Sequence, residues 1–180
     1  MKALTKLILD DMKPALGVTE PGAIAYAAAK AKSYLEGEVE QVCVAMNSGM
    51  YKNAFTCGIP NSSEVGNVFA AALGVVAGNA EKGLESLADV RPEDNTSAKK
   101  LIEQGKVQVE LSGITSRIFI EAFVKTTSGE ATVTIRDSHT NIVKIVVNGK
   151  IVLDKESEEV LGNKEENKTH AIHNYTLEQL

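Results

Sequence analysis

One stretch of the 180-residue chain decides its fold class: Ile142-Val143-Lys144-Ile145-Val146-Val147-Asn148-Gly149-Lys150-Ile151-Val152-Leu153. Two mostly apolar runs flank Asn148-Gly149, and an Asn-Gly pair in this position is the strongest short signal for a β-hairpin. Upstream, the same period-two alternation recurs at Val107–Leu111, Ile118–Val124 and Ala131–Ile135. The second half of the chain is therefore predicted to form an antiparallel sheet.

The first half carries helical patterns instead. Small residues fill the stretch 22–31, which follows Thr19-Glu20-Pro21, a polar cap with proline in the first turn. So much alanine on nearly every face predicts a buried helix that packs closely on several sides. Further helices are predicted at 3–16, 64–77, 81–87 and 92–103, with a strand at 39–46 and a polar loop at 47–53.

These patterns predict an α+β fold in which helices rich in small residues pack with an antiparallel sheet formed mainly by the second half. One domain is expected over residues 1–154, helical at 1–105 and mainly β at 106–154. Residues 155–180 indicate a polar linker and the start of a helix that is cut off after Thr176.

Composition narrows the class of protein. Hydrophobic residues make up 43% of the chain, enough for a buried core, while aromatics are only 4%, so Ala, Val, Ile and Leu must build that core. The net charge of −5 argues against a nucleic-acid surface. No apolar run approaches the ~20 residues that span a membrane, and no signal peptide is evident, so a cytoplasmic protein without a membrane partner is expected. Cys43 and Cys57 are too few for a disulfide framework and are expected to be small, half-buried apolar residues.

Three polar stretches could carry chemistry. At 17–21 the helix start could bind an anion such as a carboxylate, although an ordinary cap is the interpretation that the pattern alone favours. At 47–53, Lys52 could pair with a carboxylate and Asn53 could donate or accept hydrogen bonds, but a solvated loop fits equally well. At 137–141, His139 suits proton transfer or substrate binding, while an exposed turn histidine is the alternative.

Other motifs that would specify a reaction are missing. The chain has no phosphate-binding Gly-Lys-Ser/Thr loop, no G-x-G-x-x-G fingerprint and no Cys-x-x-Cys pair. His170 and His173 stand in the polar tail without further ligands, so no metal site is predicted there.

Taken in order, the polar stretches resemble the serine dehydratase alpha-chain and L-cysteine desulfidase superfamily. The blocks that carry the resemblance are Gly17-x-Thr19-Glu20-Pro21, Lys52-Asn53 with Gly58-Ile59-Pro60, Gly83-Leu84-Glu85, Lys106-Val107-x-Val109-Glu110 and Ser138-His139-Thr140-Asn141-Ile142-Val143. They span nearly the whole chain at plausible spacing, which makes the resemblance fairly specific. It implies the amino-terminal half of an enzyme that converts L-serine or L-cysteine to pyruvate and ammonia.

The resemblance also implies a cofactor and site residues. In the complete family enzyme a 4Fe-4S cluster, held by three cysteines, acts as the Lewis acid. Candidate substrate-binding residues are Thr19, Glu20, Lys52 and Asn53, and candidate catalytic residues are His139 and Asn141. The expected partners are a small amino-acid substrate, the missing carboxy-terminal catalytic half and a second copy of the chain.

Two departures from the family bear on activity. Val18 stands where the family motif has its first cysteine, and the other cluster cysteines belong to the half that is missing. No metal ligand and no cluster are therefore expected in this chain alone, and a lyase activity only when it is joined to its other half. The alternative is a non-catalytic amino-acid-binding or assembly module in which the Ala-rich helices form an oligomer interface.

Overall fold

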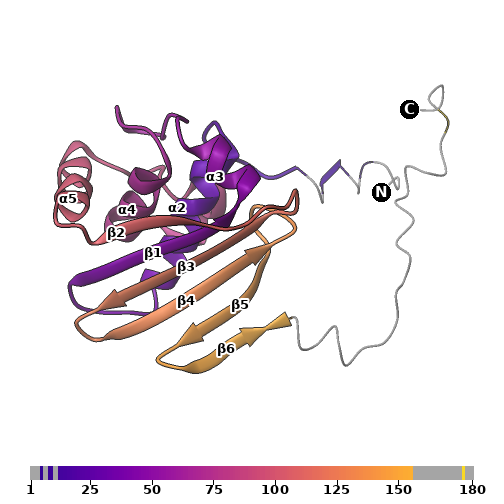
Figure 1. The fold of residues 1–180 in the computed structure, drawn as a ribbon. Coiled ribbons are helices and arrows are strands. Elements are labelled where there is room, and N and C mark those ends of the chain that lie inside the picture. The colour runs from indigo at the N-terminus through magenta and orange to yellow at the C-terminus, as the bar shows by residue number, and fades with distance from the viewer. Residues whose placement is uncertain (1–4, 6–7, 10–11, 156–175, 177–180) are drawn as a thin grey trace.

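The computed structural model describes residues 5, 8–9, 12–155 and 176, and its elements keep the labels of Figure 1. The helices of this part are α2 (Thr19–Lys32), α3 (Ser48–Ala54), α4 (Asn67–Ala77), the 3₁₀ helix η1 (Ala80–Glu85) and α5 (Pro92–Glu103). The strands are β1 (Val39–Asn47), β2 (Val107–Gly113), β3 (Phe119–Thr126), β4 (Gly129–Arg136), β5 (Ile142–Val147) and β6 (Lys150–Asp154).

The strands form one six-stranded sheet in the order β2-β1-β3-β4-β5-β6. All neighbours are antiparallel except β1 and β2, which run parallel. The Asn148-Gly149 hairpin joins β5 to β6 as expected, with both of its residues at positive φ. The predicted α+β class, with its strands mainly in the second half, is confirmed.

The helices gather on one side of the sheet, towards its β2–β1 edge (Figure 1). Alternate residues of the central strands point towards them, because successive side chains of a strand face opposite sides. Val42, Val44 and Met46 of β1 are fully buried there, and they pair with the buried Val124, Ala122 and Ile120 of β3. This face of the sheet and the helices above it form the apolar core.

The alanine-rich helix α2 lies in the middle of this core, as its composition predicts. Six of its alanines are buried, and it packs against α4, η1 and strands β3 and β4. A Cβ on Gly74 of α4 would come within 2.5 Å of the Ala25 carbonyl oxygen and 3.0 Å of the Ala28 Cβ. The small residues therefore allow the two helices to approach at backbone distance.

Three details differ from the sequence-based expectation. Residues 47–53 were expected to be a loop, but Ser48–Ala54 form α3 directly after β1. The helix expected from residue 64 starts at Asn67, because Gly66 adopts φ +93° and its N–H bonds the Cys57 carbonyl. β2 joins the sheet parallel to β1, because α5 first carries the chain back to the end where β1 begins.

Some predictions fall on other parts of the chain. Most of the helix expected at 3–16, and almost all of the segment 155–180 with His170 and His173, lie outside the described residues. Within the part that the structure describes, no helix is long and apolar enough to cross a membrane.

Candidate functional site

The polar stretches singled out by the sequence meet at one end of the sheet. β1 and β4 finish there and β3 begins there, as the pairs Met46–Ile120 and Ile120–Ile135 show. α3 follows β1 directly, and α2 runs back along the sheet so that its first turn lies at the same end.

Glu20, in the first turn of α2, is the centre of a small polar cluster. Its Oε1 accepts a hydrogen bond from Asn53 Nδ2 at 3.0 Å, and its Oε2 accepts one from the Thr19 hydroxyl at 3.3 Å. Asn53 belongs to α3, 33 residues further along the chain. The carboxylate therefore ties the start of α2 to the last turn of α3.

The electrostatics of the cluster favour the charged form of Glu20. Burial by itself would raise the pKa of this carboxyl group. Hydrogen bonds from its own backbone N–H and from Asn53, the charge of His139 and the Thr19 hydroxyl outweigh burial, so the pKa lies below its usual value of 4.5. Glu20 is consequently an anion at neutral pH, and His139 lies close enough to act on it.

His139 belongs to the turn between β4 and β5, and its charge acts on the Glu20 carboxyl group. It is half-buried, whereas Asp137 and Ser138 before it are exposed. Asn141 closes the turn: its side-chain amide donates to the Arg136 carbonyl oxygen at 3.1 Å, and its own carbonyl oxygen accepts from the Arg136 N–H at 3.0 Å. The amide nitrogen of Asn141 thus shapes the turn that carries His139.

Lys52 behaves differently from its neighbour Asn53. It is exposed on α3, and its ammonium group makes no hydrogen bond or ion pair with another described residue. The structure thus joins Thr19, Glu20 and Asn53 by hydrogen bonds, and His139 acts on Glu20 through its charge, while Lys52 and Asn141 make no bond to this group. The roles of all six residues in binding or catalysis stay predictions.

The start of α2 is not free to bind an anion. Val18 is the N-cap and offers no side-chain hydrogen bond, but the Glu20 carboxylate already accepts an N–H of the first turn. A second anion beside it would be repelled. The chemistry that fits a partly buried carboxylate is the binding of a cation or a hydrogen-bond donor, such as an α-ammonium group.

The described residues do not fit an iron–sulphur cluster. They contain no group of three His, Cys, Asp or Glu side chains that could hold a metal ion. Burial, together with Glu110 and Glu121, raises the pKa of the Cys43 thiol, which opposes the thiolate form that iron requires. The Cys57 thiol bonds the Asn53 carbonyl oxygen instead. The expectation that Cys43 and Cys57 are half-buried thiols agrees with the structure.

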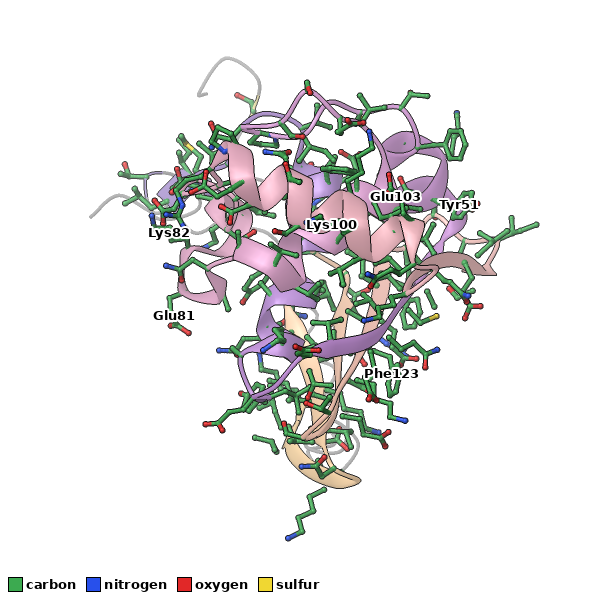
Figure 2. The ribbon with its side chains drawn as sticks, turned by 90° about the vertical axis from the view of Figure 1, so that its left-hand side faces the viewer. Tyr51, Glu81, Lys82, Lys100, Glu103 and Phe123 are labelled. Atoms are coloured by element: carbon green, nitrogen blue, oxygen red, sulfur yellow. The ribbon has the colours of Figure 1, made fainter. Side chains whose placement is uncertain are left out.

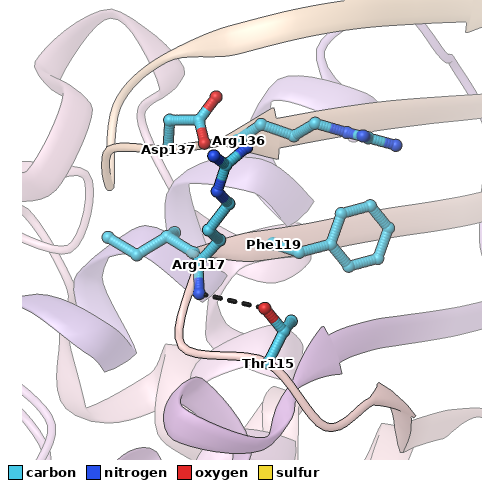
Figure 3. Close-up of a pocket in the computed structure, with 6 residues that line it drawn as sticks. Thr115, Arg117, Phe119, Arg136 and Asp137 are labelled. Atoms are coloured by element: carbon cyan, nitrogen blue, oxygen red, sulfur yellow. Dashed lines mark hydrogen bonds between the residues drawn. The ribbon is translucent and has the colours of Figure 1, made fainter.

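Sequence reasoning missed a pocket of about 260 Å³ at the same end of the sheet (Figure 3). It is lined by Thr115, Arg117, Ile118, Phe119, Arg136 and Asp137. None of the six candidate residues lines it. The only hint in the sequence is that both arginines flank predicted strands, but the pairing that makes Phe119 and Arg136 neighbours is not visible there.

The loop that forms this pocket is held by a buried asparagine. Asn47, 2% exposed at the end of β1, donates its side-chain amide to the Thr115 carbonyl oxygen at 3.0 Å and accepts from the Phe119 N–H at 3.1 Å. Such a doubly bonded buried amide fixes the backbone between residues 115 and 119.

A second pocket, of about 560 Å³, lies at the opposite end of the sheet. It is bounded by the starts of β1 and β2, the last turn of α4 and the face of α5 that includes Lys100, which Figure 2 labels together with Glu103. Lys106 donates to the Val39 carbonyl oxygen there at 3.0 Å, so this cation serves the pairing of the two strand starts.

Comparison with known proteins identifies relatives of this chain, but it does not assign an activity to it. No protein-family model matches the chain. A UPF0597 protein from Clostridium botulinum strain Hall is 38% identical over 154 residues, which are 86% of this chain and 36% of the relative. A UPF0597 protein from Shewanella sp. strain MR-7 is 44% identical over 149 residues, 82% of this chain and 35% of the relative. The chain is thus homologous to UPF0597 proteins and spans about a third of their length.

Proposed function

The chain is homologous to UPF0597 proteins over about a third of their length, and we propose that it is the amino-acid-binding, N-terminal part of an iron–sulphur-dependent lyase. The reaction would be deamination of L-serine or desulfuration of L-cysteine to pyruvate and ammonia. The chain by itself would be inactive, since the chemistry at the reacting carbon belongs to the remaining two thirds of the polypeptide.

One observation carries the proposal: the hydrogen bond that joins Glu20 of α2 to Asn53 of α3, in a cluster on which the charge of His139 acts. A carboxylate that gains hydrogen bonds from two side chains and its own backbone is held in one orientation. Preorganised groups of this kind bind a small polar ligand at low entropic cost. An amino acid offers the matching charge, because its α-ammonium group is a cation with three N–H donors.

Each residue has a separate part in this scheme. Glu20 receives the α-ammonium group, and Asn53 keeps the carboxylate in place. The exposed Lys52 is the nearest free ammonium group on the same helix as Asn53, so it is assigned to the α-carboxylate. His139 would hydrogen-bond the side chain of the substrate, and Asn141 would position it by closing the turn.

In this proposal the iron–sulphur cluster binds to the remaining polypeptide and not to this chain. Val18 stands at the place of a family cysteine, and the described residues contain no group of side chains that could hold a metal ion. The cluster would be held by cysteines in the remaining polypeptide, and this chain would present the bound amino acid to it.

A second candidate is a non-catalytic module that binds an amino acid or takes part in assembly. The valine at position 18 favours it. In that case the oligomer contact cannot use the alanines of α2, because they are buried within the chain itself. The exposed Phe55 and Ile114 would be better placed for such a contact.

Calorimetric titration of this chain with L-serine and L-cysteine tests the binding part. Glu20→Gln should weaken binding about tenfold, since it removes the charge that faces the ammonium group. Glu103→Gln is the matched control, because this exposed glutamate at the end of α5 lies outside the cluster. Equal affinity of the Glu20→Gln and unmodified chains would contradict the assignment.

The lyase part requires a longer homologous polypeptide that includes the other two thirds. After anaerobic reconstitution with iron and sulfide, cluster absorbance and pyruvate release from both amino acids are followed. Turnover by the long polypeptide, with no iron retained by this chain alone, is the expected result. Amino-acid binding without a cluster in the long polypeptide would favour the non-catalytic module.

A further inference from the structure

The core face of the sheet extends past the helices at the end where β2 finishes. Val107, Val109 and Leu111 of β2 pair in register with the fully buried row of β1, so their side chains point to the helix side of the sheet. Val107 is 6% exposed and Val109 is half-buried, but Leu111 is 50% exposed. The row of core positions therefore continues beyond the layer of helices that covers it.

Three further apolar side chains are exposed at this end of the molecule, and together with Leu111 they are called the apolar rim. Ile114, which follows β2, is 90% exposed, Phe55 at the end of α3 is 62% exposed and Val65 is 54% exposed. α3 contacts β2, and a Cβ on Gly66 would lie 2.7 Å from the Phe55 carbonyl oxygen, which places Val65 beside Phe55. Grouped apolar side chains of this kind mark protein contact surfaces.

Ile114 is exposed although its loop is tied to the start of α3. The side chains of Asn47 and Ser48 both donate hydrogen bonds to the Thr115 carbonyl oxygen, at 3.0 and 3.3 Å. Asn47 is itself buried, so this anchor belongs to the core. The fold therefore holds Ile114 in an exposed position.

Two observations indicate what covers the apolar rim. The chain spans 36% of the Clostridium botulinum relative and 35% of the Shewanella relative, so each of these polypeptides has a further part of greater length than the chain itself. A second copy of the chain is less suited to the rim, because both copies carry a net charge of −5 and repel each other. A core row that continues beyond its helices needs further chain above it, and the longer relatives possess such chain.

We propose that the apolar rim is the contact surface for the part of a UPF0597 polypeptide that this chain does not span. Leu111 and Ile114 form the centre of the contact and extend the core across it. Phe55 follows Asn53 closely on the chain, so the docked polypeptide borders the Glu20 cluster. The proposal rests on the homology and on the exposed rim, and it stands without the lyase reaction.

Carbene footprinting tests the surface on two intact proteins, this chain and the Shewanella relative that is 44% identical to it. Labelling at the positions that match Leu111, Ile114 and Phe55 should fall about fivefold in the longer protein, because the core of a contact is fully desolvated. The position that matches Phe123 is the control. Phe123, labelled in Figure 2, is half-buried on the face of the sheet opposite the helices, and its labelling should be equal in both proteins.

A chimera in which this chain replaces the matched third of the Shewanella protein gives a second measurement. Leu111→Lys should lower the midpoint of thermal unfolding by about 3 °C or more beyond its effect on this chain alone, because only the chimera takes the new ammonium group out of water. Ile151→Lys is the matched control, since Ile151 is 61% exposed on the other edge strand, β6. It should shift the midpoints of the chimera and the chain equally.

Equal labelling of the rim in the short and the long protein would overturn the proposal, and this result does not depend on a folded chimera. Protection of the Phe123 position with the rim unchanged would place the contact on the opposite face. Loss of labelling in this chain as its concentration rises, with sedimentation at twice its mass, would assign the rim to a second copy. Both measurements are made without iron, sulfide or amino acids, so their failure is distinct from a failure of the proposed lyase.

Discussion

A single carboxylate, that of Glu20, connects segments that are distant in sequence. It joins the first turn of α2 to the end of α3 through Asn53 and lies within the electrostatic reach of His139. Ionisation of Glu20 therefore contributes to the stability of this end of the sheet as well as to its charge. The two effects can be separated by changing pH.

Glu20→Gln should lower the free energy of unfolding at pH 7 by about 0.5–1.5 kcal/mol, the usual worth of a hydrogen bond to a protein group. The folded-state pKa lies below 4.5, so the contribution of the charge is complete above that pH and is lost as pH falls through the folded-state pKa. Urea unfolding at pH 7 and at a series of acidic pH values should show a gap between the two chains that narrows as pH falls. A gap of equal size at all pH values would mean that the charge of Glu20 contributes nothing to stability.

At the residue scale, local sequence signals could indicate where polar side chains lie, while the roles of these residues stay predictions. The cap motif pointed to Thr19 and Glu20, and the turn composition pointed to His139; Glu20 bonds Thr19 and Asn53, and the charge of His139 acts on Glu20. The pocket lined by Arg117 was missed because it depends on strand register and on a wall contributed by another strand. The buried role of Asn47 depends on the same long-range pairing and leaves no local trace.

At the scale of elements, the crossing of α2 and α4 depends on glycine and alanine, whose side chains are absent or a single methyl group. Ala25 and Ala28 of α2 face Gly74 of α4, and the helices touch along this line. Larger side chains would separate the helices and open the core beneath them. Close packing of this kind tolerates added volume poorly.

Gly74→Ala should destabilise the chain by about 1–3 kcal/mol, the usual cost of overpacking, although alanine is the better helix former. The new Cβ would lie 2.5 Å from the Ala25 carbonyl oxygen, so the helix backbone has to move. Gly113→Ala is the control, because nothing lies within 4 Å of a Cβ at that position. The midpoints of thermal unfolding of the two variants are compared. Equal midpoints would show that α2 and α4 can accommodate the added methyl group without cost.

The helices and strands that could be predicted from the sequence were those specified by neighbouring residues. The Asn148-Gly149 hairpin and the alanine helix follow from turn chemistry and composition, and both are present. The strand at Val107–Leu111 was predicted, but its parallel pairing with β1 was not, because nothing within that run indicates which strand it will join. α3 was taken for a loop since its residues, rich in Asn, Ser and Gly, are weak helix formers.

At the scale of the molecule, α2 makes one core out of the helical half and the β half. It contacts α4 and η1 on one side and β3 and β4 on the other. Neither half could keep its apolar surface buried if the other were removed. The boundary near residue 105 thus divides kinds of secondary structure and does not divide the core.

Urea unfolding of the whole chain should therefore be a single cooperative transition. The helix signal in far-ultraviolet circular dichroism and the near-ultraviolet signal of Tyr26, Tyr34 and Tyr51 should change with the same midpoint. Hydrogen exchange should give matching protection in α2 and β3. Two separate transitions would indicate two lobes that fold independently.

The central place of β1 in the sheet has a consequence for synthesis on the ribosome. Its partner β2 emerges about 65 residues after it, and its partner β3 about 80 residues after it, which at translation rates of roughly 5–20 residues per second is a delay of several seconds. During that delay the strand Val39–Asn47 lacks both of its sheet partners, and the face of α2 that packs on β3 and β4 is uncovered. A nascent chain stalled near residue 105 should accordingly be captured by cellular chaperones, and release should come only when β3 has left the ribosome.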